Sequence, residues 1–138
     1  MSLQPIAIPR PLVNQILHHA QAASTLEVCG LIGARDGIPT TCYPLDNVSE
    51  QAETRFAPDP GQQVEAMRTL RERGETLFAI FHSHPAAPAL PSASDREQLG
   101  YPETLYLIVS LNTKGVLEMR GFRLEEGRQF AEIPLCLA

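Results

Sequence analysis

The chain has 138 residues, which is enough for one domain with a hydrophobic core and too few for two ordinary domains. Hydrophobic residues make up 43% of the chain and charged residues 20%, proportions that exclude a disordered chain. The net charge of −5, with no basic run, argues against a general affinity for nucleic acid. We therefore expect a single globular domain over residues 1–138.

The first half of the chain predicts one helix among three strands. The expected elements are a strand over 6–8, a helix starting at the prolines 9 and 11, a strand over 27–34 and a strand over 40–45. Leu12, Ile16 and Ala20 recur at helical spacing within the helix. The segment Arg35-Asp36-Gly37 is typical of the hairpin turn that would join the second and third strands.

The middle of the chain predicts a long polar loop followed by a second helix. The loop spans Asp46 to Pro60, with a short strand expected around residues 55–56. Asp59-Pro60 is typical of a helix start, and the helix is expected to run to about residue 73 and stop at Gly74. We expect Val64, Met67 and Leu70 on its inner face.

The second half of the chain predicts mainly strands. An apolar run over 76–81 fits a buried strand, although a buried helix segment has the same pattern. A helical turn over 96–99 that ends at Gly100, a turn over 113–115 and strands over 105–111, 116–124 and 128–135 follow. The fold class expected is α/β, with a mixed, partly antiparallel sheet flanked by helices.

The cysteines and the N-terminus bear on localisation. Cys29, Cys42 and Cys136 are widely spaced and odd in number, so they predict no disulfide framework and favour a reducing compartment. The N-terminus lacks the charged start and long apolar core of a signal peptide, and no apolar stretch reaches membrane-spanning length. We expect a cytoplasmic protein with no membrane partner.

A histidine pair follows the apolar run at 76–81. If the run is a strand, His82 and His84 project to the same face, where two imidazoles can grip one cation. Pro85 ends the strand, and a stiff proline-rich loop leads to Ser92 and Asp95. Two histidines and one carboxylate leave a tetrahedral zinc with an open position for water, as catalytic zinc sites require.

This pattern carries a resemblance to a known family. His82-Ser83-His84-Pro85, six residues, then Ser92-Ala93-Ser94-Asp95 resembles the motif of the JAMM (MPN-plus) zinc metallopeptidases. The family also has an upstream glutamate two residues before a Cys-Gly, and Glu27-Val28-Cys29-Gly30 matches that context. The fold that the resemblance implies is the MPN/JAMM fold, which is cytidine-deaminase-like.

The resemblance also implies roles for individual residues. His82, His84 and Asp95 would bind Zn²⁺, and Glu27 would be the general base and acid. Ser92 would hydrogen-bond the reacting water or the developing oxyanion. Ser83 is expected on the opposite face of the strand, without a catalytic role, and Cys29 is expected to be a small buried hydrophobe rather than a ligand.

Three functions remain open at this point. They are a zinc peptidase or isopeptidase, a zinc hydrolase of small amides, and a non-catalytic interaction module of the MPN type. The retained ligands argue against the last, which metal content would test, while a substrate screen separates the first two. The small prokaryotic members of the family imply a ubiquitin-like or sulfur-carrier partner with a Gly-Gly tail. The oligomeric state is not predicted.

Overall fold

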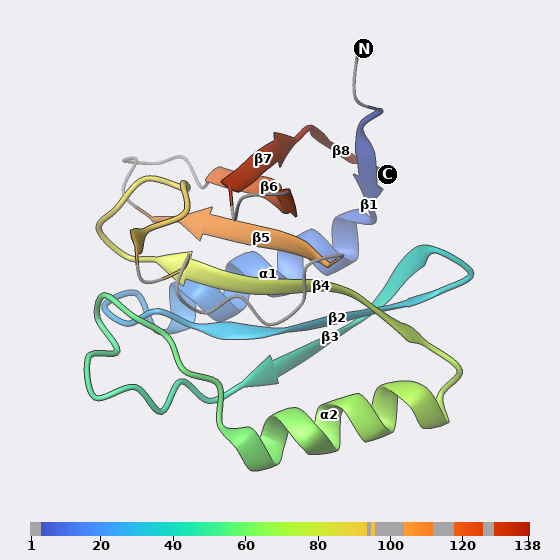
Figure 1. Cartoon of the computed structure of the whole chain (residues 1–138), viewed down its shortest axis with the longest axis horizontal. Helices are drawn as coiled ribbons and strands as arrows, with labels where there is room; N and C mark the ends of the chain where they lie inside the picture. Colours follow the sequence, from blue (N-terminus) through green and yellow to red (C-terminus); the bar gives the residue numbers. More distant parts are fainter. Residues whose placement is uncertain (1–3, 94, 96–103, 112–117, 126–128) are drawn as a thin grey trace.

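The computed structural model describes residues 4–93, 95, 104–111, 118–125 and 129–138 (Figure 1). A six-stranded sheet has the order β3-β2-β4-β5-β6-β7, and β1 pairs with β8 in a separate two-stranded sheet. The helices that lie wholly within the described residues are α1 (Arg10–Ala22) and α2 (Pro60–Glu72). The strands are β1 (Ile6–Ile8), β2 (Cys29–Arg35), β3 (Ile38–Leu45), β4 (Thr76–His84), β5 (Leu105–Ser110), β6 (Glu118–Glu125), β7 (Gln129–Ile133) and β8 (Leu135–Leu137).

The predicted fold class is confirmed. Within the large sheet, β4 and β5 are parallel, whereas the other neighbouring strands pair in the antiparallel direction. Helix α1 lies behind the sheet in the view of Figure 1, and α2 lies in front of it beside β3. The chain is therefore an α/β domain whose mixed sheet is flanked by helices.

The alternation of side chains along β4 separates two hydrophobic cores. Ala79 and Phe81 pack with the buried face of α1, whereas Ile80 packs with Leu31 and Ala66 on the α2 side. His82 and His84 continue the second series, because side chains two apart share a face of a strand. The central strand thus carries the histidine pair on its α2 face, and both histidines lie within the strand rather than beyond its end.

The predicted start and stop of α2 are confirmed. The Asp59 side chain accepts a hydrogen bond from the Gln62 N–H at 3.0 Å, and Pro60 begins the helix. Gly74 has a φ of +74°, a conformation that favours glycine, and it follows the helix as expected. Tertiary hydrogen bonds between Asp46 and Gln62, and from Arg35 to the Arg73 carbonyl, add to these local signals at the two ends of the helix.

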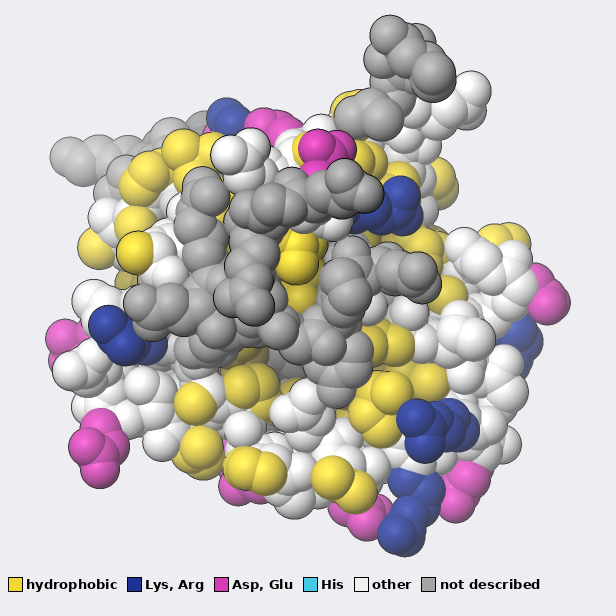
Figure 2. Space-filling model, in the orientation of Figure 1, with side chains coloured by type: hydrophobic (Ala, Val, Ile, Leu, Met, Phe, Trp, Pro, Cys, Tyr) yellow, Lys and Arg dark blue, Asp and Glu magenta, His cyan; other side chains and the backbone are white. Residues whose placement is uncertain are grey.

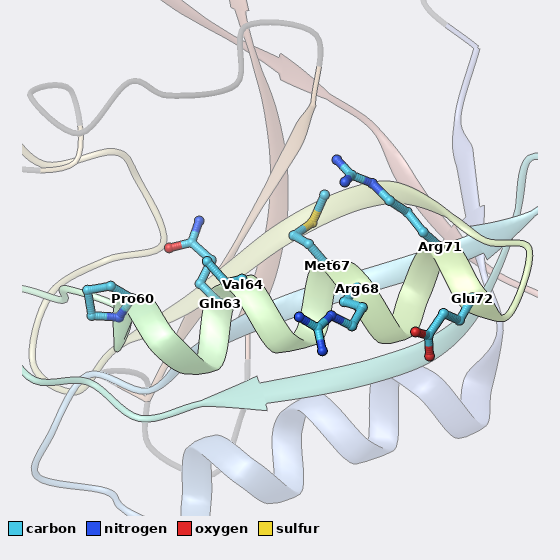
Figure 3. A pocket seen from close by; sticks show the side chains of 7 residues that line it. All are labelled: Pro60, Gln63, Val64, Met67, Arg68, Arg71 and Glu72. Atoms are coloured by element: carbon cyan, nitrogen blue, oxygen red, sulfur yellow. The ribbon is translucent and has the colours of Figure 1, made fainter.

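The expected inner face of α2 is partly wrong. Leu70 is buried, but Val64 is 62% exposed, and Ala66 is buried in its place. Each residue turns a helix by about 100°, so Val64 lies almost opposite Ala66. Met67 is partly buried and packs against the core on the α2 side, as expected, and together with Val64 it also lines a surface cavity along α2 (Figure 3). Hydrophobic side chains are visible along this lower part of the molecule in Figure 2.

Two predicted strands differ from the structure. The strand expected over 128–135 is two strands in different sheets, because Pro134 has no N–H to continue a ladder. Residues 55–56 form no strand, since the backbone there bonds to the side chain of Asn47.

The helical turn expected at 96–99, its expected end at Gly100 and the turn expected at 113–115 lie outside the described residues. In the part of the chain that is described, none of the helices is long and apolar enough to span a bilayer.

A buried carboxylate joins β3 to the start of β4, far from the histidine pair. Glu75 is 4% exposed and accepts hydrogen bonds from the hydroxyls of Thr40, Thr41 and Tyr43, with Arg73 at 3.8 Å. Burial by itself raises the pKa of Glu75, but these donors and Arg73 outweigh it and leave the pKa below its ordinary value. The ionised form is therefore part of the folded structure.

Glu75→Ala is expected to lower the free energy of unfolding by about 2–4 kcal/mol, because three hydroxyls lose their common acceptor. Urea denaturation at neutral pH measures the loss. Because the folded-state pKa is depressed, the stabilisation is present above the unfolded-state pKa and declines as the pH falls through the folded-state value. Glu72→Ala, on the exposed end of α2, is the matched control, and an equal loss in both variants would contradict the assignment.

Candidate metal centre and active site

Four buried side chains converge at the end of β4. The ligand-type atoms of Glu27, His82, His84 and Asp95 all lie within 4.8 Å of one another. Each of these residues is at most 8% exposed. The structure therefore brings together the four residues to which the sequence assigned ligand and base roles, although they come from three separate segments of the chain.

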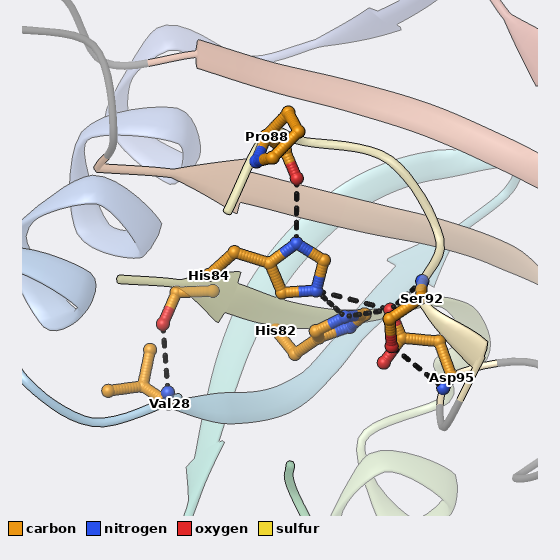
Figure 4. A network of polar contacts seen from close by, with 7 residues as sticks. Val28, His82, His84, Pro88, Ser92 and Asp95 are labelled. Carbon is orange, nitrogen blue, oxygen red and sulfur yellow. Dashed lines mark hydrogen bonds and ion pairs between the residues drawn. The ribbon is translucent and has the colours of Figure 1, made fainter. Parts of the chain in front are cut away.

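Three of these groups form a compact triangle (Figure 4). His82 Nε2 lies 3.1 Å from His84 Nε2, and the Asp95 Oδ2 lies 3.1 Å from each of these nitrogens. The Nδ1 of His84 lies 2.8 Å from the Pro88 carbonyl oxygen, which can only accept a hydrogen bond. In the neutral imidazole, the lone pair of His84 Nε2 therefore points toward the centre of the triangle, as a metal ligand requires.

The surroundings of the triangle shift the ionisation of its members. Burial lowers the pKa of His82, whereas for His84 the contacts with Asp95 and the Pro88 carbonyl outweigh burial and raise the pKa. Burial alone raises the pKa of Asp95, but the two imidazoles and the Ser92 N–H outweigh it and hold this pKa well below its usual range. Asp95 is thus a carboxylate, the form in which it binds a cation.

Ser92 fixes Asp95 by two reciprocal hydrogen bonds. The Ser92 N–H donates to Asp95 Oδ2 at 2.8 Å, and the Asp95 N–H donates to the Ser92 Oγ at 3.1 Å. This is the arrangement of a capping box, in which two residues three apart satisfy each other's backbone donors. The spacing Ser-x-x-Asp could have predicted it, and it gives Ser92 a positioning role that the sequence reasoning missed.

Glu27 lies beside the triangle, just before β2 begins. Burial raises the pKa of Glu27 to about 7, an effect that His84 opposes and Asp95 reinforces. The expected second strand began at Glu27, but β2 begins at Cys29, so Glu27 precedes the sheet. Cys29 itself is fully buried, as expected, and burial raises the pKa of its thiol to about 12, which makes it a poor ligand.

Ser83 faces away from the histidine pair, as the alternation predicts. Its Oγ accepts a hydrogen bond from the Val28 N–H at 2.9 Å, and its own N–H donates to the Val28 carbonyl at 3.0 Å. The residue next to Glu27 is therefore tied to the strand that carries the histidines. An aromatic ring completes the surroundings: Phe56 stacks on His82, with ring centroids 4.4 Å apart.

A cavity of about 500 Å³ opens beside these groups. Glu27, His84 and Ser92 line it, as does most of the loop over 85–91. Glu53 and Thr54, from the long loop after β3, also line it. The proline-rich loop after β4 and the long polar loop after β3 therefore both border the space through which a substrate can reach the site.

Comparison with known proteins agrees with the motif and the fold. Residues 9–124 match the family model described as prokaryotic homologs of the JAB domain. The chain belongs to this family. The resemblance to the JAMM (MPN-plus) proteins is thereby confirmed, and the family match spans most of the α/β domain.

Three curated relatives are similar over most of their length. A CysO-cysteine peptidase of Mycobacterium tuberculosis is 30% identical over 124 residues, covering 88% of this chain and 84% of the relative. A desampylase of Haloferax volcanii is 32% identical over 103 residues, covering 70% of this chain and 74% of the relative. A probable TtuB-protein conjugate cleaving protease of Thermus thermophilus is 34% identical over 128 residues, with coverages of 93% and 82%.

A solved structure matches nearly the full length of this chain. The solution structure of protein DSY2949 from Desulfitobacterium hafniense superposes with a TM-score of 0.85 at 34% sequence identity. The match covers 96% of this chain and 92% of that protein. The architecture is thus shared with an experimentally determined structure over nearly the full length of both chains.

Proposed function

We propose that this chain is a zinc-dependent peptidase or isopeptidase that hydrolyses the amide bond at the C-terminal tail of a ubiquitin-like or sulfur-carrier protein. The observation that carries the proposal is the buried cluster of Glu27, His82, His84 and Asp95. The relatives support the substrate class, since their names are CysO-cysteine peptidase, desampylase and probable TtuB-protein conjugate cleaving protease.

The dimensions of the triangle support zinc as the metal. Ligand atoms that lie about 2.0–2.1 Å from a tetrahedral zinc are about 3.3 Å from one another. The three separations of 3.1 Å among His82, His84 and Asp95 are close to that value. Two imidazoles and one carboxylate are also a donor set that catalytic zinc sites use, with the fourth position open.

The proton transfers of the reaction fall to Glu27. Zinc, when bound, supplies a Lewis acid that polarises the scissile carbonyl and lowers the pKa of water. Glu27 lies beside the three ligands without belonging to the triangle, so its carboxylate can take a proton from the attacking water and deliver it to the leaving amine. His82, His84 and Asp95 hold the metal, and the two reciprocal hydrogen bonds between Ser92 and Asp95 hold this carboxylate in place.

Ser92 has a second role in this proposal. It lines the cavity together with Glu27 and His84, the space where the carbonyl group of the substrate would lie. A hydroxyl at this place can stabilise negative charge that develops on that oxygen. Ser92 would therefore both support a ligand and contact the reacting group.

The shape of the entrance supports a slender substrate tail. The stiff loop over 85–91 and the loop that carries Glu53 and Thr54 both border the cavity. An extended tail of two glycines has no side chains to collide with these walls, and its backbone groups can bond to the exposed edges of the loops. A C-terminal Gly-Gly tail is therefore the substrate feature that we propose.

Replacing the two tail glycines of the partner by valines is expected to abolish cleavage, because the branched side chains crowd the entrance. A model conjugate of a sulfur-carrier protein is incubated with the enzyme, and intact-mass spectrometry follows the release of the tail. The metal content of the enzyme and the fold of the valine-tailed partner serve as controls. Equal cleavage rates for both tails would contradict the proposed tail and would favour a hydrolase of small amides.

We also propose a cytoplasmic location and a single catalytic domain over residues 1–138. Cys29, Cys42 and Cys136 are all unpaired, which supports a reducing compartment. The prokaryotic JAB family match over residues 9–124 supports the assignment of one domain. Cell fractionation tests the location, and limited proteolysis tests the domain assignment.

A further inference from the structure

Asn47 lies two residues beyond the end of β3 and uses its whole side-chain amide. Its Nδ2 donates to the carbonyl oxygens of Glu27 and Arg55, both at 2.9 Å. Its Oδ1 accepts from the N–H groups of Ser49 and Ala57, both at 3.0 Å. An amide side chain has two donor hydrogens and two acceptor lone pairs, so no hydrogen-bonding capacity of Asn47 is left over.

The backbone of Glu27 depends on these contacts because it lies outside the sheet. β2 begins at Cys29, so no strand ladder holds Glu27. Its N–H donates to the Ala52 carbonyl at 2.7 Å, and its carbonyl accepts from Asn47. Both backbone groups of Glu27 are therefore bound by the loop over 46–59, which leaves the sheet at the end of β3.

The side chain of Glu27 is held by fewer hydrogen bonds than its backbone. Among the described residues, its buried Oε1 has no hydrogen-bond partner. The place of the carboxylate beside His84 and Asp95 is thus set largely by where the backbone is held. A shift of about 1 Å in a reacting group can lower a rate by about a hundredfold.

We propose that Asn47 is a positioning residue that holds Glu27 in place for proton transfer. The inference rests on the proposed role of Glu27 as the general base. Asn47 connects that residue to Arg55 and Ala57, close to the Glu53 and Thr54 that line the cavity. The loop that borders the substrate and the backbone of the base are thereby joined through one side chain.

Asn47→Asp separates the two halves of this contact. The new carboxylate has nearly the same shape and can still accept from Ser49 and Ala57, but it cannot donate to Glu27 or Arg55. We expect kcat to fall about 10- to 100-fold, while KM and zinc content change less than about twofold. Asn47→Ala, which adds no charge, should show the same division between kcat and KM.

Ser49→Ala is the matched control in the same loop. It removes an Oγ that accepts from the Gln51 N–H and keeps the backbone N–H that binds Asn47. We expect its kcat to remain within about twofold of the parent, because no contact to Glu27 changes.

A double variant distinguishes positioning from a general loss of structure. If Asn47 acts through Glu27, adding Asn47→Asp to Glu27→Gln should lower kcat by less than about a further threefold, because proton transfer is already lost in Glu27→Gln. The proposal would be overturned if the kcat of the double variant fell by the product of the two single-variant effects. It would also be overturned if KM or zinc content, rather than kcat, changed, or if neither Asn47 variant folded.

Hydrogen exchange keeps this test separate from that of the proposed function. An unaltered protein that cleaves no conjugate would contradict the function but not the contact. The amide of Glu27 should then still exchange at least about tenfold faster in Asn47→Asp than in Ser49→Ala, because the local opening is easier. Equal exchange in the two variants would overturn the proposed contact whatever the activity.

Discussion

His84→Ala and Asp95→Ala are each expected to lose the bound zinc and all measurable cleavage. Purified protein should contain about one zinc per chain, held by three side chains and completed by water. Removing one member leaves two ligands, which cannot fix the ion against dialysis. Elemental analysis after dialysis measures the metal, and the conjugate-cleavage assay measures the activity.

His18→Ala is the control for these two variants, because His18 is an exposed histidine of α1 outside the cluster. It should keep both zinc and activity. Circular dichroism establishes that each variant is folded. Full zinc in His84→Ala and Asp95→Ala would mean that the ligands are misassigned, even if cleavage is lost.

Glu27→Gln is expected to retain zinc while cleavage falls by a factor on the order of a hundred or more. Glutamine keeps the size and polarity of the side chain but cannot carry a proton between the water and the leaving amine. The variant therefore separates the base from the ligands, which lie at nearly the same place in the structure. Metal analysis and single-turnover cleavage of the conjugate are measured on the same preparation.

Glu53→Gln is the matched control, since Glu53 is a second carboxylate that lines the cavity but lies outside the buried cluster. Its turnover should remain within a few-fold of the parent. Loss of zinc in Glu27→Gln would make Glu27 a ligand, and unchanged turnover would remove it from the mechanism.

The histidine pair among the proposed ligands was predictable from a local rule, because side chains two apart share a face of a strand. Asp95 was predicted from the family motif, and the structure places it beside both histidines. Glu27 was different, since its position beside the histidines depends on the pairing of β2 with β4 and on the loop over 46–59 that binds its backbone. Only the family resemblance distinguished it from an ordinary surface carboxylate.

The features that sequence reasoning missed depend on tertiary contacts. In the sequence, Asn47 is indistinguishable from the other polar residues of its loop. Its hydrogen bonds to Glu27, Arg55 and Ala57 form only when the loop folds back. Val64 is more hydrophobic than Ala66, yet the sheet buries the alanine. Two missed signals were local: a proline inside an expected strand, here Pro134, predicts a break, and the spacing of Ser92 and Asp95 predicts a capping box.

The parallel pairing of β1 with β8 constrains the order in which the chain acquires its structure. Ile6 pairs with Leu135 and Ile8 with Leu137, so β1 finds its partner only about 130 residues later, after a long loop closes. During synthesis on a ribosome, the large sheet can begin to form while β1 still lacks a partner. The small sheet is therefore a late step of folding. Until it forms, the first strand is an unpaired edge that chaperones or neighbouring chains can bind.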